Sequence, residues 1–147
     1  MRGTVRVRRL MVASGLAGAM VMALALPAMG QSTLVTSGDL NTPAGVTIGK
    51  GRMTRQIERE RTVAQVKVSG LDPRTQYTAE VHTGPCSAVP PGGAVYAGFS
   101  PSPMRFSTDR NGAGDGSSHL DAVAGPTAVS IVLYSGSTRI ACADLTP

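Results

Sequence analysis

The feature that most constrains this chain is a pair of cysteines, Cys86 and Cys142, in a sequence that opens like an export signal. In the oxidising compartments that exported proteins enter, two thiols in one domain tend to form a disulfide. A Cys86–Cys142 bridge would tie the middle of the chain to its last residues, and on the loop-closure view it would stabilise the fold by about 4 kcal/mol, less any strain. The alternative is two separate buried thiols.

Residues 1–30 have the three parts of a secretory signal peptide. Four arginines precede an uncharged apolar run at 10–26, and small residues at positions 28 and 30 then predict cleavage before Gln31. A retained membrane anchor is the competing interpretation, but a run of about 17 residues is short for a spanning helix. Arg8-Arg9 leaves a twin-arginine export route open beside the general secretory one. We therefore expect a secreted, periplasmic or cell-envelope protein without a stable membrane span after cleavage.

The leader also accounts for most of the positive charge. The whole chain carries a net charge of +5, but the part after Gly30 has two lysines and eight arginines against nine acids, a net of +1. Its few aromatic residues do not alternate with basic ones, so it lacks the pattern of stacking and charge that binds nucleic acid. The high isoelectric point belongs mainly to the precursor, and we expect no nucleic-acid partner.

Residues 31–147 are long enough for one domain with its own core. The segments 62–68 and 76–82 alternate apolar and polar residues with the period of two that is typical of half-buried strands. Further strands are expected at 44–49, 104–108, 119–123, 128–134 and 138–145. With several short strands and no amphipathic helix, the pattern predicts an all-β, antiparallel β-sandwich or barrel.

The connections are expected to be turns and loops rich in glycine and proline. Residues 31–43 are interpreted as a polar lead-in, 49–51 and 109–118 as turns, and 52–61 as either a helical turn or a charged edge strand. Residues 83–103, with five prolines, fit no regular element. A loop this long in a compact domain is usually functional, so it is the predicted place for a ligand or protein partner.

Three segments, taken in order, resemble the copper–zinc superoxide dismutase family. Val-Ser-Gly-Leu at 68–71 followed by Tyr-Thr-Ala-Glu-Val-His at 77–82 is similar to the strand, turn and strand that end in that family's His-x-His pair. Cys86 and the Pro-Gly-Gly at 91–93 resemble its loop cysteine and metal loop. The segment 130–142, which ends in Arg-Ile-Ala-Cys, resembles its closing hairpin. The resemblance covers roughly residues 62–145 and implies an antiparallel Greek-key fold of the superoxide dismutase type.

The resemblance also implies a metal centre, which this chain has largely lost. In the family, four histidines hold copper, and one of them bridges to a zinc that takes two more histidines and an aspartate. This chain has only His82 and His119, and His119 aligns with no ligand position. Glu80 stands at one member of the His-x-His pair, Ala94 at the bridging position and Tyr134 at the last copper ligand. Two histidines cannot supply the six imidazoles that this centre needs, so most of the metal ligands are missing.

His82 and Arg139 are the family residues that are retained. His82, Glu80 and Tyr134 could converge on a first-row metal such as copper, or they could be a polar patch left by the loss of the site. In the family the arginine attracts the superoxide anion and orders a loop; without copper, the ordering role of Arg139 is favoured.

These considerations leave three hypotheses about function. We expect an exported superoxide dismutase-like domain without dismutase activity, and no cofactor. The first alternative is a metal-dependent enzyme or copper-binding protein with a reduced site around His82. The second is an unrelated secreted β-sandwich that serves as a binding module.

Overall fold

The computed structural model describes residues 32–147, so the predicted signal peptide and its cleavage site lie outside the described residues. The described part forms eight strands and one short 3-10 helix: β1 (Thr33–Asn41), β2 (Thr47–Gln56), η1 (Ile57–Arg59), β3 (Arg61–Val68), β4 (Gln76–His82), β5 (Met104–Ser107), β6 (Gly114–Leu120), β7 (Ser130–Ser135) and β8 (Thr138–Asp144). Within these residues, no helix is long and apolar enough to cross a membrane.

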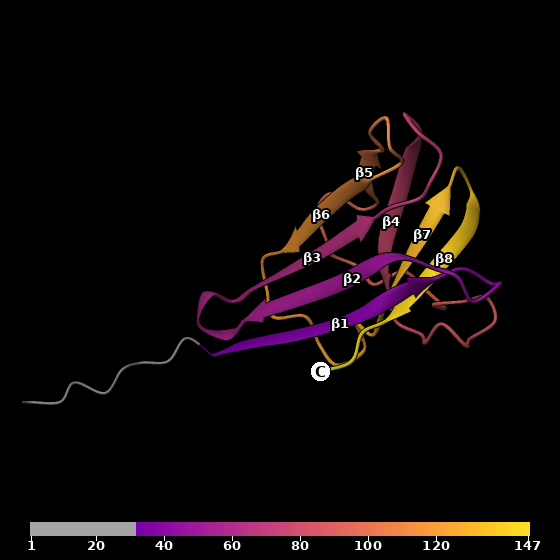
Figure 1. The fold of residues 1–147 in the computed structure, drawn as a ribbon. Helices are drawn as coiled ribbons and strands as arrows, with labels where there is room; N and C mark the ends of the chain where they lie inside the picture. Colours follow the sequence, from indigo (N-terminus) through magenta and orange to yellow (C-terminus); the bar gives the residue numbers. More distant parts are fainter. Residues whose placement is uncertain (1–31) are drawn as a thin grey trace, which may run out of the picture.

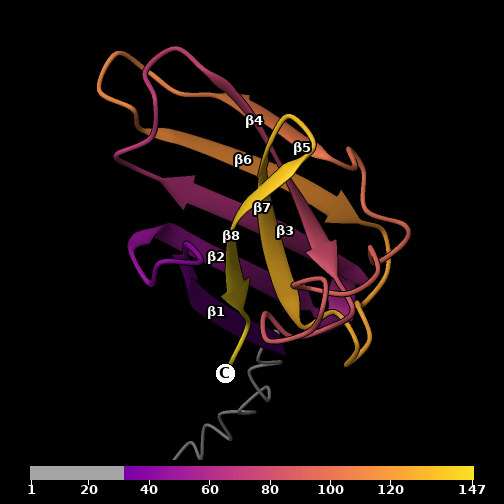
Figure 2. The same ribbon diagram turned by 90° about the vertical axis from the view of Figure 1, so that its right-hand side faces the viewer.

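All eight strands belong to one antiparallel sheet in the order β5-β4-β7-β8-β1-β2-β3-β6. The sheet curls round on itself, with β7 and β8 at the right-hand side of the molecule in Figure 1. In the view turned by 90°, β7 and β8 cross in front of β2 and β3 (Figure 2). An antiparallel bridge between Ser100 and His119 brings the chain before β5 against β6 and nearly closes the barrel. The predicted all-β, antiparallel Greek-key barrel is confirmed.

The core fills the inside of this barrel with aliphatic and methionine side chains. Its most deeply buried members include Leu40, Met53, Val66, Ile131 and Leu133, each at most 1% exposed. They come from strands whose alternate residues point inward, which is why the period of two in β3 and β4 identified those strands correctly. With no tryptophan and only five aromatic residues, the interior depends on these smaller side chains.

Two segments interpreted as irregular are in fact strands. Residues 33–41 form β1 instead of a polar lead-in, and the Gly-Lys-Gly at 49–51 lies inside β2 instead of forming a turn. A β-carbon on Gly49 would stand 2.1 Å from the backbone oxygen of Lys67 in β3. Glycine here permits a close approach between neighbouring backbones, and the sequence pattern cannot distinguish that use from a turn.

The glycine-rich stretch 109–118 was likewise only partly a turn. The turn ends before Gly114, where β6 begins, and Gly116 packs so closely on the ring of Phe106 that a β-carbon would lie 2.8 Å from it. The prediction of a strand at 119–123 is therefore correct only as far as Leu120, where β6 ends. Two other expected strands, at 44–49 and 128–134, begin later, at Thr47 and Ser130.

The charged segment 52–61 divides between three elements. Its first residues end β2, its middle forms η1, and Arg61 begins β3. Because β2 lies between β1 and β3, the expectation of an edge strand is wrong, while that of a helical turn holds for Ile57–Arg59.

Candidate functional site

The site that the resemblance singles out lies on the outer face of β4 and β7. These strands are paired so that Glu80 stands opposite Val132 and His82 opposite Ser130. Tyr134 lies further along β7, and its side chain extends back toward His82, so that the Tyr134 hydroxyl oxygen is 2.9 Å from His82 Nε2. The two strands thus bring together three of the predicted site residues.

A loop covers this outer face and excludes solvent from it. His82, Ser130 and Val132 are fully buried although their side chains point away from the barrel core. The covering segment is 83–95, the first part of the predicted long loop, and Gly92 forms its closest contact. Gly92 has a φ of +81°, and a β-carbon there would stand 2.5 Å from Val132 Cγ2. Only glycine fits this position without a shift of the loop.

The loop is attached to the barrel by covalent and polar contacts. The disulfide between Cys86 and Cys142, with a Cα–Cα distance of 5.7 Å, joins it to β8, which confirms the predicted bridge. The backbone N–H of Cys86 donates to the Asp144 carboxylate at 2.7 Å, and the Ser130 hydroxyl donates to the Gly84 carbonyl at 2.7 Å. The outer face of β7 and β8 therefore holds the loop near its start.

Arg139 holds the far part of the same loop. Its guanidinium donates to the carbonyl oxygens of Pro91 and Gly93, and its Cζ lies 5.7 Å from the centre of the Tyr134 ring. A cation over an aromatic face is attracted by the ring electrons. The geometry thus gives Arg139 the contacts that ordering the loop requires.

The two ring nitrogens of His82 both have partners within the protein. Nδ1 is 3.1 Å from the carbonyl oxygen of Gly93. Since a carbonyl only accepts, Nδ1 carries the hydrogen of the neutral ring, and Nε2 is left as an acceptor for the Tyr134 hydroxyl. The arrangement is a chain of two hydrogen bonds from Tyr134 through His82 to the loop.

The surroundings favour the uncharged forms of both side chains. Burial lowers the pKa of His82, and the positive charge of Arg139 lowers it further. The hydrogen bond to Gly93 and the negative charge of Glu80 raise the pKa but do not outweigh these effects. Burial also raises the pKa of the Tyr134 hydroxyl. Glu80, about one-fifth exposed, has its nearer carboxylate oxygen 3.9 Å from His82 Nε2. The centre of the site is therefore a neutral imidazole–phenol pair with charged groups at its edge.

The other candidate positions contribute no donor to this centre. Ala94 follows Gly93 in the loop, where its carbonyl oxygen accepts from the backbone N–H of Thr83 at 2.9 Å, and its methyl side chain has nothing to offer a metal. His119 lies on β6, where its backbone forms an antiparallel bridge with Ser100. In the sheet, β6 is not a neighbour of β4, which carries His82.

The donor set does not fit the copper–zinc centre that the resemblance implies. Among residues 32–147, no three histidine, cysteine, aspartate or glutamate side chains gather as a metal site would require. His82 supplies the only imidazole of this site within the described residues, and its free lone pair accepts a hydrogen bond from the Tyr134 hydroxyl. The guanidinium of Arg139 adds positive charge beside the Tyr134 ring. A redox copper held by several imidazoles cannot be assembled from these groups.

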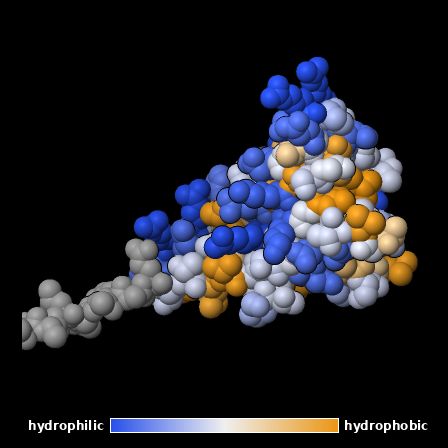
Figure 3. Space-filling view, viewed as in Figure 1, coloured by the Kyte–Doolittle hydropathy of each residue, from blue (hydrophilic) through white to orange (hydrophobic). Residues whose placement is uncertain are grey.

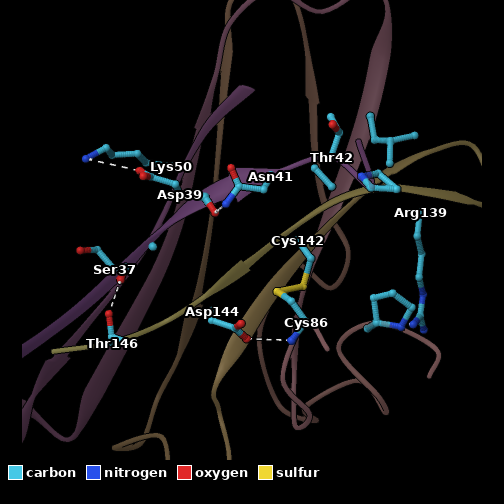
Figure 4. Close-up of a pocket in the computed structure, with 15 residues that line it drawn as sticks. Ser37, Asp39, Asn41, Thr42, Lys50, Cys86, Arg139, Cys142, Asp144 and Thr146 are labelled. Carbon is cyan, nitrogen blue, oxygen red and sulfur yellow. Dashed lines mark hydrogen bonds and ion pairs between the residues drawn. A yellow bond between two sulfur atoms is a disulfide. The ribbon is translucent and has the colours of Figure 1, made fainter. Parts of the chain in front are cut away.

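Beside this centre, a hollow of about 650 Å³ opens between β1, β8 and the loop (Figure 4). The disulfide lies in its wall, with Asp144 and Arg139 on either side of it in the figure. Of the predicted partner loop, only Cys86 and Pro91 line this hollow. The sequence did not predict this hollow, because part of its wall comes from residues 37–43, a segment interpreted as a polar lead-in and not as a strand.

Comparison of the chain with protein-family models finds no match, and comparison with curated proteins finds none either.

Proposed function

We propose that this chain is an exported superoxide dismutase-like domain that does not dismute superoxide and serves as a binding or structural module. The observation that carries the proposal is that the protein itself occupies both nitrogens of His82. Where the family would place a metal, this chain has a neutral hydrogen-bonded pair, and dismutation requires a centre that accepts and returns an electron. The shortage of imidazole ligands supports the same conclusion.

In this proposal the residues of the former centre hold a loop instead of a metal. Tyr134 donates to His82, His82 donates to Gly93, and Arg139 donates to Pro91 and Gly93. The hydrogen bonds from His82 and Arg139 end on the segment 83–95, and the one from Tyr134 holds the His82 ring. The domain would then present this loop in a fixed position on a rigid scaffold, as binding loops commonly are.

The test is to load the exported protein with copper and zinc, dialyse it, and measure bound metal together with superoxide consumption. We expect bound metal far below a stoichiometric amount and no catalysed superoxide loss. Near-stoichiometric copper with turnover would overturn the proposal.

One observation favours a second candidate, a metal site reduced to His82, Glu80 and Tyr134. The hydrogen bond from Nδ1 to a carbonyl is the arrangement that commonly orients metal-binding imidazoles, and it leaves Nε2 directed at the other two side chains. Copper that is bound by the wild type and lost in Glu80→Gln, but retained in the control Glu58→Gln on η1, would favour this candidate. The third hypothesis, an unrelated secreted β-sandwich module, shares the expected absence of dismutase activity.

A further inference from the structure

We propose that the outer face of β1, β2, β3 and β6 binds a polyol or saccharide that carries two or more phosphate ester groups. This face is separate from the His82 centre, and the inference does not depend on whether that centre holds a metal.

The register of the strands gathers positive charge in the middle of this face. Lys50 on β2 stands directly opposite Lys67 on β3, and Arg52 occupies the next outward-facing position along β2. Like charges directly opposite each other on neighbouring strands destabilise a sheet. Three cations are therefore held together at adjacent positions at some cost to the fold.

Carboxylates neutralise this charge only in part. Lys50 has an exposed ion pair with Asp39, with an N–O distance of 3.6 Å. Asp115 stands opposite Lys67 in the register of β3 and β6, but the two make no ion pair. Among residues 32–147, Arg52 and Lys67 have no carboxylate within ion-pair distance, so both can bind an external anion.

A hollow of about 500 Å³ lies among these side chains. Its wall includes Lys50, Arg52 and Lys67 against the single acid Asp115, a net charge of +2. Hydrophilic side chains cover most of the surface over β2 and β3 (Figure 3). The larger hollow beside the disulfide has two acidic and two basic side chains in its wall, so its net charge is zero and it favours neither anions nor cations. The smaller hollow, with its net positive charge, favours an anionic ligand.

The uncharged groups in the same wall indicate the rest of the ligand. Ser37, Gln65 and Ser117 form a cross-strand row with Arg52 and supply hydroxyl and amide groups that suit sugar hydroxyls. Arginine and lysine together suit phosphate oxygens, arginine through paired N–H groups and lysine as a point charge. A bilayer surface fits less well, because the charges surround a hollow and Val35 is the only partly exposed apolar side chain in its wall.

The test is a calorimetric titration of the exported protein with myo-inositol hexakisphosphate, with unphosphorylated myo-inositol as the ligand control. We expect binding only of the phosphorylated ring, and binding that weakens as salt is added. Arg52→Gln and Lys67→Gln should each lower the affinity about ten-fold, the loss of one charge-assisted hydrogen bond. Arg110→Gln, in the turn between β5 and β6, removes the same charge elsewhere and should leave the affinity unchanged.

Three results would overturn the inference. One is an absence of binding to the hexakisphosphate. Another is an equal loss of affinity in Arg110→Gln, which would show a response to net charge alone. The third is binding to vesicles of equal parts phosphatidylglycerol and phosphatidylcholine without binding to the soluble ligand, which would indicate a membrane partner. Thermal melts of the variants confirm that each is folded, and none of these results bears on the metal content that tests the proposed function.

Discussion

Gly92 packs against Val132 so closely that a β-carbon at position 92 would stand 2.5 Å from the Val132 Cγ2 atom. The contact joins the covering loop to the outer face of β7, directly beside His82, whose Cβ would be 3.1 Å away. The loop and the site around His82 are thus one packed unit, and this relationship can be tested by substitution.

Gly92→Ala should lower the free energy of unfolding by about 2–4 kcal/mol, because it adds a steric clash to the strain of a positive φ. Gly136→Ala is the matched control: Gly136 has a φ of +59° but nothing within 4 Å of its would-be β-carbon. It should cost only about 1 kcal/mol, the backbone strain alone. Denaturant unfolding measures both, and equal losses would show that the loop does not pack tightly on β7.

His82 should make the stability fall in mild acid. Its pKa in the folded state is lowered below the unfolded value of about 6.5, so the unfolded chain binds a proton first as the pH drops. The neutral side chain therefore contributes to the free energy of unfolding above about pH 6.5, and this contribution is lost as the pH falls from 6.5 through the pKa of the folded state. An NMR titration of the imidazole protons measures the pKa of His82 in the folded protein directly. A midpoint for His82 at or above that of the unfolded chain would contradict the prediction.

Reduction of the Cys86–Cys142 bridge should lower the free energy of unfolding by about 4 kcal/mol, on the loop-closure view. The loop amides should respond most, because Gly84 N–H donates to Gly92 and Gly92 N–H donates to Pro85 within the released segment. Hydrogen exchange in the Cys86→Ser/Cys142→Ser double variant should therefore be faster at these amides than in β2 and β3. Exchange at these loop amides that is no faster than in the oxidised protein would contradict the prediction.

Arg55 should contribute more to stability than any exposed arginine. It is buried on β2, where its Nε donates to the Ala124 carbonyl at 3.0 Å and its Nη2 to the Ala128 carbonyl at 3.1 Å, which holds the connection between β6 and β7. Arg55→Met would leave two buried carbonyls without donors and should cost about 3 kcal/mol. The control Arg105→Met, on the exposed side of β5, should cost less than about 0.5 kcal/mol. Similar losses in thermal or denaturant unfolding would rule out this role for Arg55.

The sequence alone was sufficient for the fold class, the bridge and most of the strands. Alternation in 62–68 and 76–82 is a local property, because each residue of a strand faces the core or the solvent according to its position. It was insufficient for β1 and for the part of β2 that follows Gly49, because glycines such as Gly49 make close contacts with residues far away in the chain. The side chain that meets a glycine is known only once the sheet is assembled.

The candidate site, too, was predicted only in part by the sequence. The identities of His82, Glu80, Tyr134 and Arg139 were determined by the sequence, and so was the shortage of imidazole ligands. The tertiary structure decided the hydrogen bond from Tyr134 to His82, the burial of His82 under residues 83–95 and the gathering of cations on β2 and β3. The physical reason is that strand register and loop packing set distances between residues, and neither is a property of any single segment.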